Sequence, residues 1–69
     1  MNCGRIKWIS PDASYGFILL PDGQEAYFNA FDMIRGDISM IAPGEEVSFD
    51  LLQTPKGFEA FNVQAYLFA

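Results

Sequence analysis

The 69-residue sequence contains no histidine and only one cysteine, Cys3. Catalysis by a Ser–His or Cys–His pair is therefore excluded, because the general base is missing. Carboxylate chemistry remains open, but acids such as Asp22 and Glu45 lie beside Gly or Pro, where acids usually occupy solvated turns. A lone cysteine forms no internal disulfide, and a structural zinc site needs four Cys or His ligands. We therefore expect a reduced, cytoplasmic protein that is not an enzyme and holds no metal ion or other cofactor.

Basic residues are also scarce. Four Lys and Arg stand against nine Asp and Glu, which gives a net charge of −5. This balance disfavours binding to duplex nucleic acid through a basic face, and it disfavours an anionic membrane surface. No apolar run approaches the roughly 18 residues that span a bilayer. The first residues lack an apolar stretch after a basic one, so we expect no signal peptide.

Apolar and aromatic residues, by contrast, are plentiful. Half of the chain (51%) is hydrophobic, and it contains seven Phe, three Tyr and one Trp. A chain of this length is expected to form one domain, over residues 1–69. The apolar content exceeds what a core this small needs, so part of it is expected on the surface.

Gly and Pro divide the chain into short runs rich in Ile, Val, Phe, Tyr and Trp, whose length and spacing are typical of strands. The five runs are Arg5–Ile9, Tyr15–Leu20, Glu25–Asn29, Glu46–Gln53 and Phe58–Tyr66. One short helical turn is expected near residues 30–34, anchored by Phe31 and Asp32. Five strands with tight turns predict an all-β fold, a small closed barrel.

Alternation within the strands predicts which side chains face outward. In the second run, Ile18 is the natural core residue, so Tyr15 and Phe17 point to the outside. In the third run, a core made of Ala26 and Phe28 leaves Tyr27 outside. Trp8 on the first run is a candidate fourth member of this outer group.

Four segments, in order, resemble motifs of the cold-shock domain family. Gly4–Trp8 followed by Tyr15–Ile18 resembles G-x-V-K-W-F-N followed by K-G-F-G-F-I, and residues 26–30 loosely match V-F-V-H-F. Residues 44–49 resemble G-Q-x-V-S-F, and residues 56–63 match K-G-x-x-A-x-N-V. The resemblance runs from Gly4 to Val63 with almost no gap.

This resemblance implies a five-stranded antiparallel Greek-key barrel of the oligonucleotide-binding (OB) fold. It further implies binding of single-stranded RNA or DNA, with action as an RNA chaperone or a transcription antiterminator. Stacking residues of the family correspond to Trp8, Tyr15, Phe17 and Tyr27. The other positions carried over to the binding surface are Lys7, Asn29, Ile38, Lys56 and Phe58.

The sequence departs from the family pattern where binding is concerned. Asn29 occupies the position of a stacking His and keeps hydrogen-bonding capacity without the ring. Ala30 replaces a Phe and Ala13 replaces a Lys. An alternative hypothesis is therefore a barrel that has lost nucleic-acid binding and serves as a protein-interaction or dimerisation module.

The last six residues, 64–69, include Tyr66, Leu67 and Phe68. They extend past the last family motif. This apolar segment either seals the bottom of the barrel or pairs with a second copy, so the sequence leaves open a monomer or a homodimer.

Overall fold

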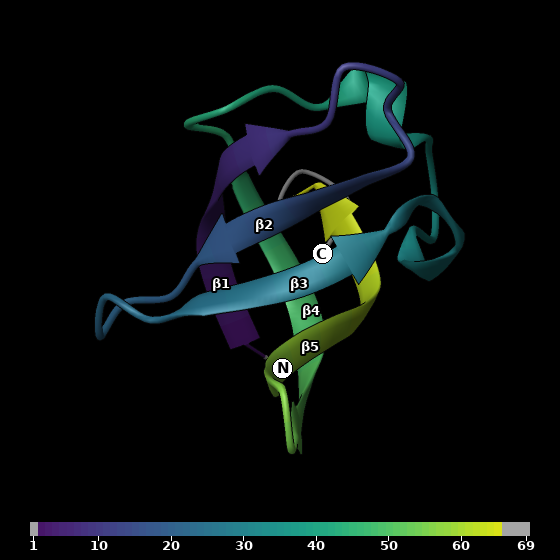
Figure 1. Cartoon of the computed structure of the whole chain (residues 1–69). Helices are drawn as coiled ribbons and strands as arrows, with labels where there is room; N and C mark the ends of the chain where they lie inside the picture. Colours follow the sequence, from purple (N-terminus) through teal and green to yellow (C-terminus); the bar gives the residue numbers. More distant parts are fainter. Residues whose placement is uncertain (1, 66–69) are drawn as a thin grey trace.

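A computed structural model describes residues 2–65, which form five strands and two isolated 3-10 turns (Figure 1). The strands are β1 (Asn2–Ile9), β2 (Tyr15–Leu19), β3 (Glu25–Asn29), β4 (Glu46–Thr54) and β5 (Gly57–Ala65). The turns are η1 (Ala30–Asp32) and η2 (Ile38–Met40). No helix within the described residues has the length and apolar character needed to cross a membrane.

The strands close into a barrel in the order β1-β2-β3-β5-β4, with β4 pairing back onto β1. The predicted all-β, five-stranded barrel is confirmed, and its strand arrangement is consistent with an OB-fold. One pair differs from the expected antiparallel arrangement, because β3 and β5 run parallel. A parallel pair needs a long connection, and the chain supplies it through η1, η2 and β4 before β5 returns beside β3.

The strand boundaries follow the predicted runs closely. β3 covers the predicted residues Glu25–Asn29, and β2 begins at Tyr15 as expected. β1 begins three residues earlier than predicted, since Asn2, Cys3 and Gly4 also pair with β4. The predicted roles of Tyr66, Leu67 and Phe68 in sealing or dimerisation fall outside the described residues.

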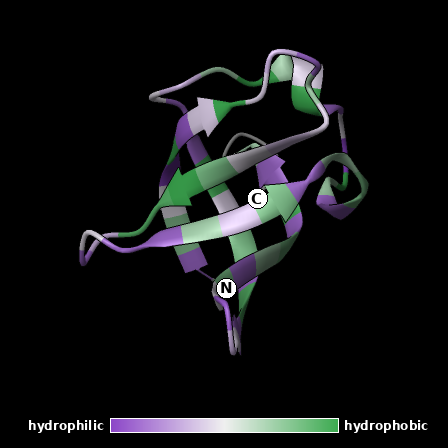
Figure 2. Cartoon of the chain, viewed as in Figure 1, coloured by the Kyte–Doolittle hydropathy of each residue, from purple (hydrophilic) through white to green (hydrophobic). Residues whose placement is uncertain are grey.

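The barrel interior holds one continuous apolar core, and Phe28 and Phe49 are its largest fully buried side chains. Ile18, Ala26 and Phe28 point inward, as the alternation predicts. Figure 2 shows apolar and polar residues alternating along the strands that build this interior. The opposite faces of β2 and β3 are consequently turned toward solvent, and they carry the rings described next.

The predicted turn near residues 30–34 is confirmed as η1, whereas η2 was not expected. η1 follows β3 directly, and a capping box closes its start. The Asn29 side chain accepts a hydrogen bond from the Phe31 N–H (2.8 Å), and the Asp32 carboxylate accepts one from the Asn29 N–H (3.0 Å). These bonds fix the direction in which the chain leaves the barrel wall.

Candidate nucleic-acid interface

Four aromatic rings lie together on the outer surface of β1, β2 and β3. We refer to Trp8, Tyr15, Phe17 and Tyr27 as the aromatic quartet. The ring centroids of Tyr15 and Phe17 both lie 5.8–5.9 Å from that of Tyr27, and the Trp8 centroid lies 5.5 Å from that of Tyr15. The rings meet edge-on or tilted, which are favourable aromatic geometries. Trp8 is 42% exposed, and the other three rings are half-buried, so all four reach the surface.

Strand register explains why the rings meet. Phe17 pairs directly with Tyr27, and Tyr15 pairs with Asn29, one step along the same face of the β2–β3 ladder. Gly16 lies between Tyr15 and Phe17 on the opposite face. There a Cβ atom would come within 2.6 Å of the Trp8 carbonyl oxygen and 3.1 Å of the Phe28 ring. Close packing behind the rings therefore holds β2 against β1 and the core.

Trp8 joins the quartet because β1 contains a bulge. Simple alternation would give Ile6 and Trp8 the same orientation, and Ile6 is buried in the core. The pairing of β1 with β2 shifts between these two residues, however: Ile6 pairs with Ile18, but Trp8 pairs with Phe17. The extra residue, Lys7, allows both Lys7 and Trp8 to be exposed.

The loop before Tyr15 is held by a small polar network. The Asp12 carboxylate accepts hydrogen bonds from the hydroxyls of Ser10 and Ser14, both at 2.8 Å. The Ser10 hydroxyl in turn accepts a bond from the Tyr15 N–H at 3.2 Å. The hydrogen bonds to the carboxylate, the larger effect from Ser14 and the smaller from Ser10, hold the pKa of Asp12 below its ordinary value. The network thereby fixes the point at which β2 and the quartet begin.

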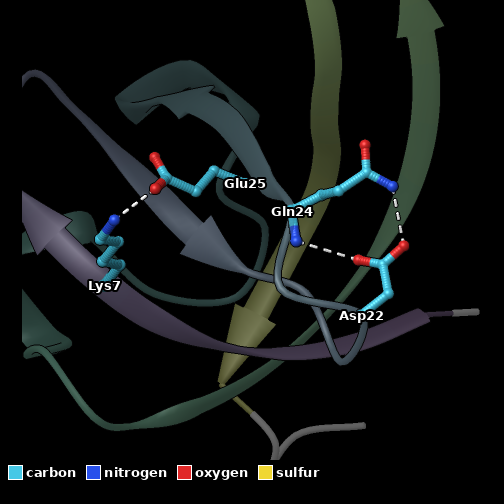
Figure 3. A network of polar contacts seen from close by, with 4 residues as sticks. All are labelled: Lys7, Asp22, Gln24 and Glu25. Carbon is cyan, nitrogen blue, oxygen red and sulfur yellow. Dashed lines mark hydrogen bonds and ion pairs between the residues drawn. The ribbon is translucent and has the colours of Figure 1, made fainter.

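Two lysines border the quartet, and only one of them, Lys7, is ion-paired within the described residues. The Lys7 ammonium forms an ion pair with the Glu25 carboxylate on β3, across the intervening β2, as Figure 3 shows. In the adjacent β2–β3 turn, Asp22 accepts hydrogen bonds from the backbone and side chain of Gln24. Lys56 is exposed, and its ammonium group has no ion-pair partner within residues 2–65. Lys7 is therefore neutralised within the fold, whereas Lys56 is available to an anion.

Lys56 and Phe58 share one hollow with the quartet. A cavity of about 340 Å³ is lined by Tyr27, Thr54, Lys56, Phe58 and Glu59, together with Gly57. Phe58 is half-buried and pairs with Ala26 across the parallel β3–β5 ladder. The structure thus brings two of the predicted site residues beside Tyr27, from the opposite end of the sequence.

Comparison with known proteins agrees with this architecture. The profile of the 'Cold-shock' DNA-binding domain family matches residues 2–66. The chain belongs to the cold-shock domain family. Among curated relatives, it is 34% identical over 64 residues to cold shock protein CspB of Bacillus caldolyticus, covering 91% of this chain and 96% of that protein. It is 36% identical over 63 residues to cold shock-like protein CspJ of Salmonella typhimurium, covering 90% of each. Cold shock-like protein CspC of Shigella flexneri is 35% identical over 63 residues, with 90% of this chain and 91% of that protein covered.

In this cold-shock domain, Asn29 caps η1 and also lies beside the quartet. Its side-chain oxygen is engaged in the cap of η1, so the amide nitrogen is the group left to meet a base edge. Asn29 also pairs with Tyr15 across the β2–β3 ladder. A substitution here would therefore disturb the turn as well as any contact with a ligand.

The prediction that Ile38 lies on the binding surface is wrong in this structure. Ile38 is 2% exposed and packs in the apolar core. η2 is responsible: its cap on Asp37, which accepts a hydrogen bond from the Ser39 N–H at 3.2 Å, turns Ile38 inward and leaves Met40 exposed. Burying an aliphatic side chain is favourable in free energy, so Ile38 packs in the core and not on the surface.

Sequence reasoning missed two exposed rings. Phe31 is predicted to anchor η1, but its side chain is 97% exposed, and the capping box formed by Asn29 and Asp32 anchors the turn instead. Phe61 on β5 is 40% exposed. For Phe31 a signal was available, since it follows Ala30, the position at which the family motif has a Phe. For Phe61 the family motif, which leaves this position unspecified, gave no signal.

Proposed function

We propose that this cold-shock domain binds unpaired segments of RNA or DNA by stacking their bases on the aromatic quartet. It does so without catalysis or a cofactor. The observation that carries the proposal is the exposure of four adjoining rings on one face of the barrel. Every base has a π-face, so such platforms bind single strands with little regard to sequence, at about 1–3 kcal/mol per stacked base.

Stacking also dominates the energetics. Four platforms supply roughly 4–12 kcal/mol before the cost of ordering the strand is subtracted. The electrostatic contribution is smaller, because the chain has only four Lys and Arg and a net charge of −5. Even if all four cations met phosphates, the logarithm of the affinity would fall with a slope of about −3 against the logarithm of salt concentration. A duplex, whose bases are already stacked and covered, is expected to bind poorly.

A domain that binds only unpaired bases destabilises secondary structure in its ligand. Binding to the open form shifts the equilibrium between paired and open RNA by mass action, and it needs no ATP. This is the activity of an RNA chaperone, and it is the cellular role that we propose. Regulation of transcription as an antiterminator would follow from the same step, because a terminator hairpin is a paired form.

The test is a titration of Trp8 fluorescence with heptathymidine at about 50 mM and about 200 mM salt. We expect quenching at micromolar or lower strand concentration, with only a mild loss of affinity at the higher salt. A Phe17→Ala variant should bind about 5- to 150-fold more weakly, which corresponds to about 1–3 kcal/mol. Leu19→Ala is the matched control, because Leu19 is exposed on the same face of β2 but outside the quartet.

The same variants test the proposed cellular role. A fluorophore–quencher RNA hairpin should open when the wild-type domain is added and stay closed with Phe17→Ala. Absence of quenching at high micromolar heptathymidine would overturn the proposal and favour the protein-interaction module. If Phe17→Ala unfolds, Phe17 supports the core and its assignment to the binding face is wrong.

A further inference from the structure

A second hollow adjoins the quartet on the side away from Trp8. It measures about 360 Å³, and the lining residues that matter for binding are Tyr27, Asn29, Asp32, Leu52, Glu59 and Phe61. Tyr27 and Glu59 also line the hollow that contains Lys56. The binding face therefore does not end at Tyr27 but continues from β3 onto β5 and β4.

Strand pairing makes this continuation direct. Tyr27 pairs with Glu59 in the parallel β3–β5 ladder, and Glu59 pairs with Leu52 in the antiparallel β4–β5 ladder. Glu59 and Phe61 are exposed, whereas Ala60 between them is buried, so the two side chains share the outer face of β5. Residues two apart on a strand are about 6–7 Å apart, which places a ring and a carboxylate within the span of one nucleobase.

The hollow offers an apolar surface for a base. Leu52 is 54% exposed and Phe61 is 40% exposed, although both are large apolar side chains. Phe61 supplies a π-face and Leu52 an apolar neighbour. The strand that crosses the quartet needs to advance by only one position past Tyr27 to place its next base there, and covering these side chains would release the water that they now face.

Glu59 supplies the polar edge of the hollow. Within residues 2–65 its carboxylate has no ion-pair or hydrogen-bond partner. An ionised carboxylate is acceptor-only, and near a phosphate chain it repels unless it meets hydrogen-bond donors. Because Glu59 lies between two hollows of the proposed face, we expect it to bind the edge of a base that donates hydrogen bonds.

Among the bases, guanine fits that edge best. Its Watson–Crick edge presents the N1–H and an amino N–H side by side, which a carboxylate accepts in a bidentate pair. Uracil and thymine present one N–H between two carbonyl oxygens, and those oxygens would face the carboxylate unfavourably. Adenine and cytosine donate through the amino group alone and place a ring acceptor beside it.

We propose that the hollow bounded by Tyr27, Leu52, Glu59 and Phe61 is a guanine-binding subsite of the single-strand interface. Phe61 stacks the base, and Glu59 accepts from its Watson–Crick edge. This inference rests on the proposed function and adds a base preference at one position to an otherwise sequence-tolerant face.

The experiment is a guanine scan, in which one thymine of heptathymidine is replaced by guanine at each position in turn and Trp8 fluorescence reports affinity. One position is expected to raise wild-type affinity about tenfold, in the range of a good bidentate contact. Glu59→Gln should abolish this gain and leave heptathymidine affinity unchanged or slightly higher. Glu45→Gln, which removes the same charge from an exposed turn, is the control and should keep the gain.

Variants of Phe61 test the subsite independently of Glu59. Phe61→Ala should lose affinity for the preferred guanine strand, and Phe61→Leu, which keeps apolar bulk, should lose it as well. The second variant keeps the test decisive if the first does not fold. A flat scan in a wild-type protein that binds heptathymidine overturns the guanine subsite and leaves the proposed function standing. Failure to bind any of the strands overturns both.

Discussion

The Lys7 ammonium and the Glu25 carboxylate form an ion pair that spans β2 at the border of the aromatic quartet (Figure 3). Both side chains are partly exposed, at 51% and 40%. Exposed pairs contribute only about 0.2–1 kcal/mol, so a phosphate could compete with Glu25 for Lys7 at little cost. The pair therefore limits the electrostatic part of binding without abolishing it.

Glu25→Gln should release Lys7 to the ligand. We expect heptathymidine affinity to rise about two- to fivefold at low salt, and the salt dependence to steepen by about 0.7, the contribution of one phosphate contact on a single strand. Fluorescence titrations over a range of salt concentrations measure both quantities. Glu45→Gln makes the same change in net charge at an exposed turn residue outside the quartet, so an equal gain in that variant would argue against a specific role for the pair.

Phe31→Ala tests whether the exposed ring on η1 takes part in binding. Phe31 is 97% exposed and follows the quartet-flanking Asn29 by two residues. Truncation should leave the unfolding free energy within about 0.5 kcal/mol of the wild type, because the ring packs against almost nothing. Affinity for a heptamer should fall by about 1 kcal/mol or more if one base stacks on the ring. Unchanged affinity in a folded variant would remove Phe31 from the interface.

Gly16→Ala should destabilise the barrel. The new Cβ would lie 2.6 Å from the Trp8 carbonyl oxygen, which is backbone and has to shift as a whole. Overpacking of this kind costs about 1–3 kcal/mol, and urea unfolding followed by circular dichroism measures it. The shift moves β1 relative to β2, so weaker strand binding should accompany the loss of stability. A variant as stable as the wild type would mean that the two strands pack less tightly than described.

Acid pH should loosen the loop that begins β2. The pKa of Asp12 is held below its ordinary value of 3.8 by hydrogen bonds from Ser14 and Ser10. The carboxylate therefore contributes stability above its unfolded-state pKa, and this contribution is lost as pH falls through the lower, folded-state pKa. Asp12→Asn should be less stable than the wild type near neutral pH, and the two should converge at the acid end. Urea unfolding at several values between about pH 2 and pH 7 tests this, and a difference independent of pH would contradict it.

Much of the barrel was predictable because its signals are local. Gly and Pro mark the turns, and the core residues Ile18, Ala26 and Phe28 follow strict alternation, which is why β2 and β3 were placed correctly. Three quartet rings follow from the same alternation. The parallel β3–β5 pair was not predictable in this way, because it joins segments about 30 residues apart through contacts that no local pattern records.

The residues that strand alternation alone does not place correctly lie at local irregularities of the backbone. Trp8 faces outward only because a bulge breaks the alternation of β1, and the pattern alone would bury it with Ile6. Ile38 and Phe31 lie in or beside 3-10 turns, where three residues per turn and a cap set the side-chain direction. The family position predicts a surface location for Ile38, and the sequence of the turn predicts an anchoring role for Phe31; the 3-10 turns reverse both.

The bulge at Lys7 also distinguishes two kinds of genetic change. A substitution in the quartet removes one ring and leaves the other three in place. Deletion of the extra residue, Lys7, would remove the bulge and make Ile6 and Trp8 neighbours, so simple alternation would still point Ile6 inward and Trp8 outward. The bulge thus sets how many residues separate the core position from the ring without deciding which face the ring occupies, and binding should survive deletion of Lys7 better than loss of any one ring.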